Sequence, residues 1–367
     1  MHDSVFSPAF GNRPSQLVGR ATLVNDVMAG LSTQPGSRER ALVMLGQRGA
    51  GKTVLLWEIA DQARRKGYVV ANPTTATEGM LERIIEKIQI DGERHTTRGP
   101  AKVSGASLSA LGFSVGLQFT QETMETKSFY YKLRGLCKSL ERLDRGVLVL
   151  VDELQANTPD LRQLVGAYQE LVGEGLNIAM VLAGLPGAVS GTLNDKVLTF
   201  LNRAMRVSLG PLATGEVDAY YAGAFGSLGM SVPAELRREA ADACEGSPYL
   251  MQLIGHYLTL YARNGVVDGT VLDDALMSAR ADFGRDVCQT TIAALSGKDV
   301  EFLREMAVDD GPSRVADVAR RMDVTVDYAQ KYRKRLIDAG VIEASGWGTV
   351  TFAVPYLRDW LRYGVGR

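Results

Sequence analysis

The sequence predicts an α/β fold built on a parallel sheet, followed by an all-α segment and a small C-terminal domain. Up to about residue 211, short apolar runs alternate with amphipathic helical patterns, which is typical of parallel strands joined by crossover helices. The runs are almost continuously apolar, so helices should cover both faces of the sheet. Residues 213–290 show helical periodicity only, and the pattern changes again from about residue 293.

Five apolar runs are the candidate strands of the sheet. They lie at residues 41–45, 68–71, 147–151, 178–183 and, more weakly, 205–209. The polar and glycine-rich segment 91–127 interrupts this order, although apolar residues alternate through 111–119. We interpret this segment as an inserted strand or hairpin. The predicted domains are therefore the α/β core at 1–211, about four helices at 212–292 and the C-terminal domain at 293–367.

Composition excludes several classes of protein. The 367 residues carry a net charge of −1, so any affinity for nucleic acid or an anionic membrane must come from a local patch. Cys137, Cys244 and Cys288 share no metal-binding spacing with the histidines, and we expect reduced core thiols. No run approaches the about 18 apolar residues of a membrane span, and the start lacks a signal-peptide pattern, so the predicted location is the cytoplasm without a membrane partner.

A glycine-rich stretch between the first strand and the following helix predicts a phosphate site, or P-loop. Residues 46–53 read GQRGAGKT and fit the pattern G-x-x-x-x-G-K-[ST]. Glycines let several main-chain N–H groups point inward, and the helix adds the positive end of its dipole. Lys52 is expected to reach the β and γ phosphates of ATP, and Thr53 to bind Mg²⁺. The candidate binding residues are Gly46, Gln47, Arg48, Gly49, Ala50, Gly51, Lys52 and Thr53.

An acidic pair follows the third apolar run. Asp152 and Glu153 come directly after residues 147–151, at the carboxyl end of a buried strand, where ligands bind in open α/β sheets. We predict that Asp152 serves Mg²⁺ and that Glu153 polarises the attacking water. With the P-loop upstream, the pair indicates an ATPase that forms ADP and phosphate.

The C-terminal domain has the element order of a winged helix-turn-helix. Helical patterns at 299–308, 314–322 and 325–340 precede two β-like runs around residues 345–348. Trp347, between two glycines, either forms a wing tip or folds onto the domain, and we favour the second.

The third of these helices is basic. One face is expected to be buried, through Ala329, Tyr332, Leu336 and Ala339. The candidate DNA-binding residues lie on other sides of the helix: Lys331, Arg333, Lys334 and Arg335. Residues 296–367 contain 12 basic and 11 acidic residues, so a solvated face or a protein-docking face is the alternative.

These motifs, in this order, resemble the AAA+ ATPases, in particular the replication initiators of the origin-recognition type, and also the helper ATPases of transposition. LVGR at 17–20 is similar to the segment that lies near the adenine, which implies nucleotide contacts by Val18, Gly19 and Arg20. FLNRAMRVSLGPL at 200–212 resembles the segment of the arginine finger, with Arg203 as first candidate and Arg206 as second. In that family the finger comes from the next subunit, which implies a homo-oligomer.

Two departures from the family pattern imply slow turnover. Where AAA+ proteins place an Asn, Ser or Thr after the strand at 178–183, this chain reads Ala183, Gly184, Leu185 and Pro186. Where initiators tend to carry an arginine in the helical lid, this chain has Tyr249. The segment 246–248 instead resembles the G-x-P element of STAND signalling ATPases, which implies that Pro248 packs near the nucleotide.

Three functions follow from these resemblances. The first is an ATPase whose nucleotide state controls association with double-stranded DNA through the winged helix. The second is a STAND-like signalling switch, in which ADP holds a closed state and the winged helix is an interdomain clasp. The third is a helper ATPase that delivers a recombinase, a protein partner. The segment 91–127 is then a structural elaboration or a contact surface for DNA or a neighbouring subunit.

Overall fold

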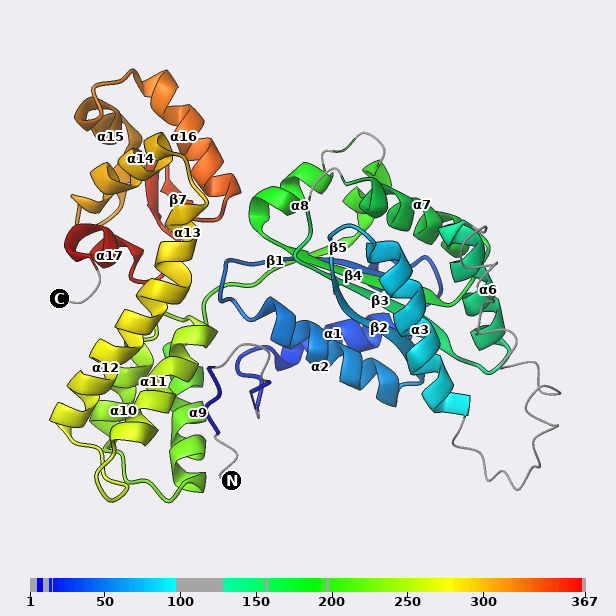
Figure 1. Ribbon diagram of the computed structural model, residues 1–367, viewed down its shortest axis with the longest axis horizontal. Helices are drawn as coiled ribbons and strands as arrows, with labels where there is room; N and C mark the ends of the chain where they lie inside the picture. The colour runs from blue at the N-terminus through cyan, green and yellow to red at the C-terminus, as the bar shows by residue number, and fades with distance from the viewer. Residues whose placement is uncertain are drawn as a thin grey trace.

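The computed structural model describes residues 5–8, 13–14, 16–96, 128–155, 158–193, 195 and 198–364. Figure 1 shows an α/β domain beside two further parts, a helical bundle and a C-terminal domain. One long helical run connects the bundle to the C-terminal domain.

A five-stranded parallel sheet forms the centre of the α/β domain, as the sequence predicts. The strands are β1 (Ala41–Leu45), β2 (Tyr68–Thr75), β3 (Gly146–Asp152), β4 (Ile178–Gly184) and β5 (Met205–Ser208). Their order in the sheet is β2-β3-β4-β1-β5. Because β4 lies between β1 and β3, the P-loop after β1 and the acidic pair after β3 lie at the same edge, on either side of the end of β4.

Helices cover both faces of this sheet (Figure 1). Alternate residues of each strand point to opposite faces, so that Leu148 and Leu150 of β3 belong to one buried cluster and Val149 to another. The first face is packed by α1 (Ala21–Gly30) and α2 (Lys52–Arg65). The second is packed by α3 (Met80–Thr96), α6 (Phe129–Glu141) and α7 (Pro159–Gly173). Short segments complete the domain: η1 (Arg38–Arg40), α8 (Pro186–Leu193) and η2 (Thr199–Arg203).

The segment predicted as an insertion begins later than residue 91. Helix α3 continues to Thr96, so residues 91–96 are helical rather than part of a hairpin. The helix is held by an apolar stripe that includes the buried Ile84, Ile85 and Ile88. The strand predicted within residues 111–119 lies outside the described residues.

The helical bundle consists of α9 (Thr214–Ser227), α10 (Ala234–Asp242), α11 (Pro248–Tyr261) and α12 (Gly269–Phe283). Helix α11 begins with a regular cap, because the Ser247 side chain accepts a hydrogen bond from the Leu250 amide and Pro248 takes the first turn. From α12 the chain continues without a break through a π-helical stretch, η3 (Gly284–Gln289), into α13 (Thr290–Ala293). A π-helical stretch of this kind often marks a functional site.

The C-terminal domain combines four helices with a three-stranded antiparallel sheet in the order β6-β8-β7. Its elements are α14 (Gly297–Ala307), β6 (Ser313–Arg314), α15 (Val315–Arg321), α16 (Val326–Asp338), β7 (Ile342–Gly346), β8 (Thr349–Phe352) and α17 (Leu357–Tyr363). On the basic helix α16, Ala329, Tyr332 and Leu336 are buried as predicted.

Trp347 is fully exposed at the turn between β7 and β8. The expectation that it folds onto the domain is therefore wrong. Strand β7 is exposed from Glu343 to Gly346, so the hairpin points away from the domain. Its turn, which carries Trp347, therefore lies in solvent.

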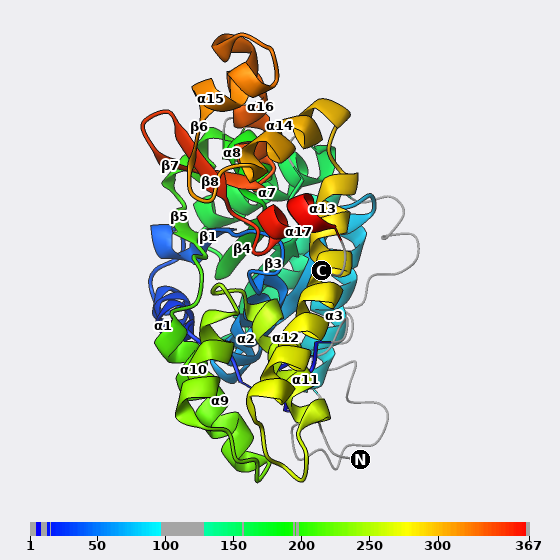
Figure 2. The same cartoon turned by 90° about the vertical axis from the view of Figure 1, so that its left-hand side faces the viewer.

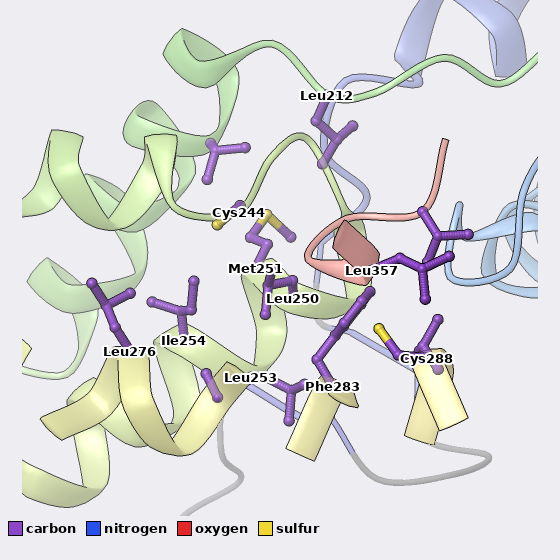
Figure 3. Close-up of a cluster of buried hydrophobic side chains, with 14 of the residues drawn as sticks. Leu212, Cys244, Leu250, Met251, Leu253, Ile254, Leu276, Phe283, Cys288 and Leu357 are labelled. Carbon is purple, nitrogen blue, oxygen red and sulfur yellow. The ribbon is translucent and has the colours of Figure 1, made fainter. Parts of the chain in front are cut away.

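The bundle and the C-terminal domain share one hydrophobic core. A single buried cluster contains Leu250 and Phe283 of the bundle together with Phe302, Leu336 and Leu357 of the C-terminal domain. Figure 3 shows Leu357 of α17 among the bundle residues of this cluster. The α/β domain has two separate clusters of its own. The predicted boundary at residues 292 and 293 thus does not separate two cores.

Candidate nucleotide-binding site

The loop between β1 and α2 has the conformation that an anion-binding turn requires. Gly49 and Gly51 have φ angles of +76° and +82°, in the left-handed region that strains other residues. Gly51 is the N-cap of α2, so the loop ends at the positive end of the helix dipole. A turn in which right- and left-handed residues alternate forms a concave nest of N–H groups, which favours binding of phosphate.

Lys52 is folded over this loop. Its Nζ donates hydrogen bonds to the carbonyl oxygens of Gly46, at 2.8 Å, and Gln47, at 2.7 Å. Burial lowers the pKa of Lys52, and the nearby Asp152 and Glu153 carboxylates oppose that shift. Phosphate oxygens that replaced the two neutral carbonyls would form stronger, charge-assisted hydrogen bonds with the ammonium group.

The predicted acidic pair lies next to the loop. The Thr53 hydroxyl donates to Asp152 Oδ2 at 2.5 Å, and Asp152 is only 6% exposed. The other oxygen, Asp152 Oδ1, accepts the main-chain N–H of Glu153 at 2.9 Å. Glu153 is exposed and its φ of +51° turns the chain sharply after β3. A hydroxyl and a carboxylate oxygen are hard ligands, so Thr53 and Asp152 fit Mg²⁺.

Residues 18–20 lie at the seam between the α/β domain and the bundle. Val18 packs against the shared core of the bundle. Arg20 Nη2 donates to the carbonyl oxygen of Gly210, just after β5, at 2.5 Å. A methyl group at Gly19 would come within 2.6 Å of Glu216 Oε2, so α9 approaches this segment closely. Burial lowers the pKa of Arg20, while Glu216 raises it.

The start of α11 contacts the P-loop from the other side. A methyl group at Gly51 would lie 3.7 Å from Cγ of Pro248, and one at Gly49 would lie 3.8 Å from Oγ of Ser247. The structure thus places Pro248 against the P-loop. Tyr249, the next residue of α11, donates its hydroxyl to Asp286 Oδ2 at 2.6 Å.

A cavity of about 640 Å³ lies in front of the P-loop. Its walls come from all three parts of the chain, and the sequence reasoning missed most of them. The turn after β5 contributes Ser208, Leu209, Gly210 and Pro211, and the bundle contributes Glu245 and residues 246–248. The C-terminal domain contributes residues 342–344 and 351–356 among others. Burial in this wall raises the pKa of Glu245.

Among the cavity residues that the sequence reasoning missed, Gly210 and Pro211 after β5 carry a local signal, since Gly-Pro marks a turn. The C-terminal wall has no local signal, because it depends on how distant parts of the chain pack.

The two arginine-finger candidates lie away from this cavity. Arg203 ends η2 and is exposed, and Arg206 lies on the edge strand β5, where Nη2 donates to Asn202 Oδ1 at 2.7 Å. Neither residue lines the cavity. Both therefore lie outside the lining of this cavity, as do Lys52, Thr53, Asp152 and Glu153.

The candidate DNA-binding residues differ in their surroundings. Lys331 and Lys334 are exposed on α16. Arg335 Nη2 instead donates to Asp299 Oδ2 at 2.7 Å, and the side chain of Asp299 is only 2% exposed. This ion pair gives Arg335 a structural role in joining α16 to α14. Arg333 is half-buried.

Comparison with known proteins identifies two domains. Residues 16–181 match the family model of the AAA ATPase domain, and residues 285–361 match a domain of unknown function (DUF8462). No protein with curated annotation matches the chain in a sequence search. Among the described residues, no helix is long and apolar enough to cross a membrane.

Several solved structures share the fold over nearly the whole chain. The Walker-type ATPase paby2304 of Pyrococcus abyssi has a TM-score of 0.69 and 16% identity, and the match covers 95% of this chain and 97% of that one. The ORC2 protein of Aeropyrum pernix, in its ADPNP-ADP complexes, has a TM-score of 0.66 and 15% identity, with 98% and 96% covered. Cdc6p of Pyrobaculum aerophilum has a TM-score of 0.52 and 15% identity, with 100% and 97% covered.

Residues 16–181 are therefore similar to the AAA ATPase domain, and the chain shares its overall fold with the Walker-type ATPase, ORC2 and Cdc6p structures. The domain match and the P-loop geometry together support a nucleotide-binding ATPase.

Proposed function

We propose that the protein is a slow ATPase whose nucleotide state controls its association with DNA through the C-terminal domain, which acts as a winged helix. The observation that carries the ATPase part is the contact of Thr53 with Asp152 beside the folded-over Lys52. A P-loop lysine, a hydroxyl and a buried carboxylate meet at the edge of the sheet where nucleotides bind.

Each residue at this edge has a role in the proposed reaction. The P-loop N–H groups and Lys52 bind the phosphates and orient the γ-phosphoryl group. Thr53 and Asp152 would hold Mg²⁺, which supplies charge neutralisation on the phosphates when it is bound. Glu153, exposed at the end of β3, orients water and accepts its proton. Turnover is slow because Gly184, Leu185 and Pro186 after β4 supply no hydrogen-bonding side chain to the water.

We assign the arginine finger to a second copy of the chain. Arg203 is exposed and lies outside the lining of its own cavity, so its side chain is available to the nucleotide of a neighbouring subunit, as in the family that the sequence resembles. An arginine that meets the γ-phosphate in the transition state lowers the barrier through electrostatic stabilisation. The active form is then a homo-oligomer in which ATP lies between subunits.

The variant Arg203→Ala is expected to bind ATP as the wild type does and to lose about 100-fold or more of its hydrolysis rate. The measurement is the ATPase rate per subunit as a function of protein concentration. The wild-type rate should rise as subunits assemble, whereas the variant rate should stay flat. The matched control is Arg238→Ala, which removes an exposed arginine from α10, and Arg206→Ala tests the second finger candidate in the same way. A variant that still shows the full rise would exclude Arg203 as the finger.

DNA association is supported by the exposed side chains of the C-terminal domain. Lys331 and Lys334 provide positive charge on α16, and Trp347 extends from the end of the β7–β8 hairpin. Lysine side chains contact phosphates, and an exposed aromatic side chain can enter a groove or stack on a base. Because the net charge is −1, such binding must come from a local patch of this kind.

Changing both Lys331 and Lys334 to glutamate is expected to weaken binding to duplex DNA. The slope of log affinity against log salt should fall by about two units, one for each lost phosphate contact. Fluorescence anisotropy at several salt concentrations measures that slope. The control changes Arg65 and Arg238 to glutamate. These two arginines are exposed on α2 and α10. Equal slopes for the two double variants would remove α16 from the DNA interface.

One observation favours a STAND-like switch as the second candidate function. Pro248 packs against Gly51, and the C-terminal domain forms a wall of the cavity, as a clasp over bound ADP would. This candidate expects purified protein to carry ADP and to lack DNA affinity. Release of nucleotide on denaturation, followed by chromatography, together with the anisotropy titration, separates the two functions.

A further inference from the structure

The end of α16 docks on the α/β domain through a contact that only glycine permits. Gly187 lies at the start of α8, directly after the end of β4. A methyl group at this position would come within 2.0 Å of the carbonyl oxygen of Asp338 and 2.9 Å of its Cα. Backbone therefore packs on backbone where the two helices meet, and Figures 1 and 2 both show α16 next to α8.

A second contact joins α16 to the P-loop itself. Gly340, which follows α16 with a φ of +69°, lies so close to Gln47 that an added methyl group would be 2.0 Å from Oε1. The Gln47 oxygen is buried and has no hydrogen-bond partner among the described residues. The carbonyl oxygen of the same residue accepts the hydrogen bond from Lys52 Nζ. The residue that touches α16 is thus bonded to the lysine that would bind phosphate.

The docked C-terminal domain and the bundle form one packed unit. Their shared hydrophobic core joins them, and Tyr356 adds polar links to the residues that precede α11. The Tyr356 hydroxyl donates to the Ala243 carbonyl oxygen at 2.8 Å, and the main-chain N–H of Tyr356 donates to Glu245 Oε2 at 3.3 Å. By contrast, the α/β domain keeps its own clusters, so its seam with this unit is where the molecule can open.

Both sides of the seam line the cavity. The P-loop forms one wall, and the unit of bundle and C-terminal domain forms the wall that faces it. Separation of Asp338 from Gly187 would move that facing wall away from the P-loop. A ligand that fills the cavity contacts both walls, so ligand binding and docking of α16 must stabilise each other.

We propose that the docked end of α16 is a latch that keeps nucleotide in its cavity. This inference rests on the proposed nucleotide binding and adds the step that limits release. Nucleotide leaves when Asp338 separates from Gly187 and Gly340 separates from Gln47. The C-terminal domain is freed by the same movement, so nucleotide exchange and exposure of α16 occur together.

The test uses the full-length chain and a fluorescent N-methylanthraniloyl derivative of ADP. The variants are Gly187→Ala and Gly187→Leu, which put a methyl and a larger side chain into the contact. The matched controls are Gly166→Ala and Gly166→Leu, because Gly166 is also helical and an added methyl group meets nothing within 4 Å there. Chasing bound probe with excess ADP in a stopped-flow instrument gives the release rate.

We expect release from both Gly187 variants to be about tenfold faster than from the wild type, within the usual range of coupling between sites. The Gly166 variants should release the probe at the wild-type rate. Thermal unfolding shows whether each variant is folded, and replacement of a helical glycine by alanine favours the helix by itself. Wild-type release from folded Gly187→Leu would overturn the latch. If the wild type binds no probe at all, the proposed nucleotide binding fails instead.

Discussion

Replacing Lys52 with alanine is expected to abolish measurable ATP binding. The Nζ atom makes two hydrogen bonds to the carbonyl oxygens of Gly46 and Gln47 and would exchange them for phosphate oxygens. Hydrogen bonds to charged groups contribute about 1.5–3 kcal/mol each. Loss of two such bonds weakens binding about 100-fold or more, because every 1.4 kcal/mol is about a factor of ten. Isothermal titration of Mg-ATP into the variant measures the effect.

Two controls make the Lys52 result specific. Lys138→Ala removes a half-buried lysine from α6, on the α/β domain but outside the cavity, and should leave ATP affinity unchanged. Thermal unfolding of Lys52→Ala shows whether the loop still folds without the two hydrogen bonds to its carbonyl oxygens. A folded variant that binds ATP as tightly as the wild type would mean that nucleotide is bound elsewhere or not by these phosphate contacts.

Glu153→Gln is expected to separate binding from hydrolysis. The amide has nearly the same size and keeps the main-chain hydrogen bond from the Glu153 N–H to Asp152, so ATP should still bind. It cannot accept a proton from water, and loss of a general base costs about 10²- to 10⁴-fold in rate. Phosphate release under single-turnover conditions measures hydrolysis, and titration measures affinity on the same sample.

The matched control for this variant is Glu141→Gln, an exposed glutamate at the end of α6. It makes the same chemical change away from the P-loop and should hydrolyse ATP like the wild type. Unchanged turnover in Glu153→Gln would exclude Glu153 as the base. A joint loss of ATP binding and turnover would instead assign Glu153 to the structure of the loop.

The α/β domain could be predicted from the sequence because its signals are local. Each strand is a continuous apolar run, and residues 46–53 have a backbone requirement that glycines reveal. The position of Asp152 beside Thr53 followed from one rule, that the carboxyl ends of parallel strands meet at one edge. The AAA ATPase domain match over residues 16–181 agrees with this prediction.

Other features could not be predicted, because they depend on packing between distant parts of the chain. Nothing near Gly187 indicates that the end of α16, at Asp338, will touch it. Likewise, Trp347 was expected to fold onto its domain, and only the direction of the hairpin shows that it is exposed. The sequence pattern did not predict the short strand β6 or the helix α17, although Leu357 of α17 is part of the shared core.

The shared core explains how a change at the P-loop can reach α16. Since bundle and C-terminal domain are one packed unit, a movement of Pro248 against Gly51 is passed to the whole unit rather than absorbed between domains. Packed cores respond to a displacement as rigid bodies and not by gradual deformation. In the proposed mechanism, the ligand at the P-loop then sets the position of α16.

A crystal structure of the protein grown with Mg²⁺ and a non-hydrolysable ATP analogue tests nucleotide binding at the P-loop most directly. We expect the triphosphate in the cavity in front of residues 46–53, with Lys52 Nζ moved from the Gly46 and Gln47 carbonyl oxygens to the phosphates and with Mg²⁺ beside Thr53 and Asp152. Analogue bound at any other place, or a P-loop that keeps the Lys52 hydrogen bonds at saturating analogue, would contradict the proposed site.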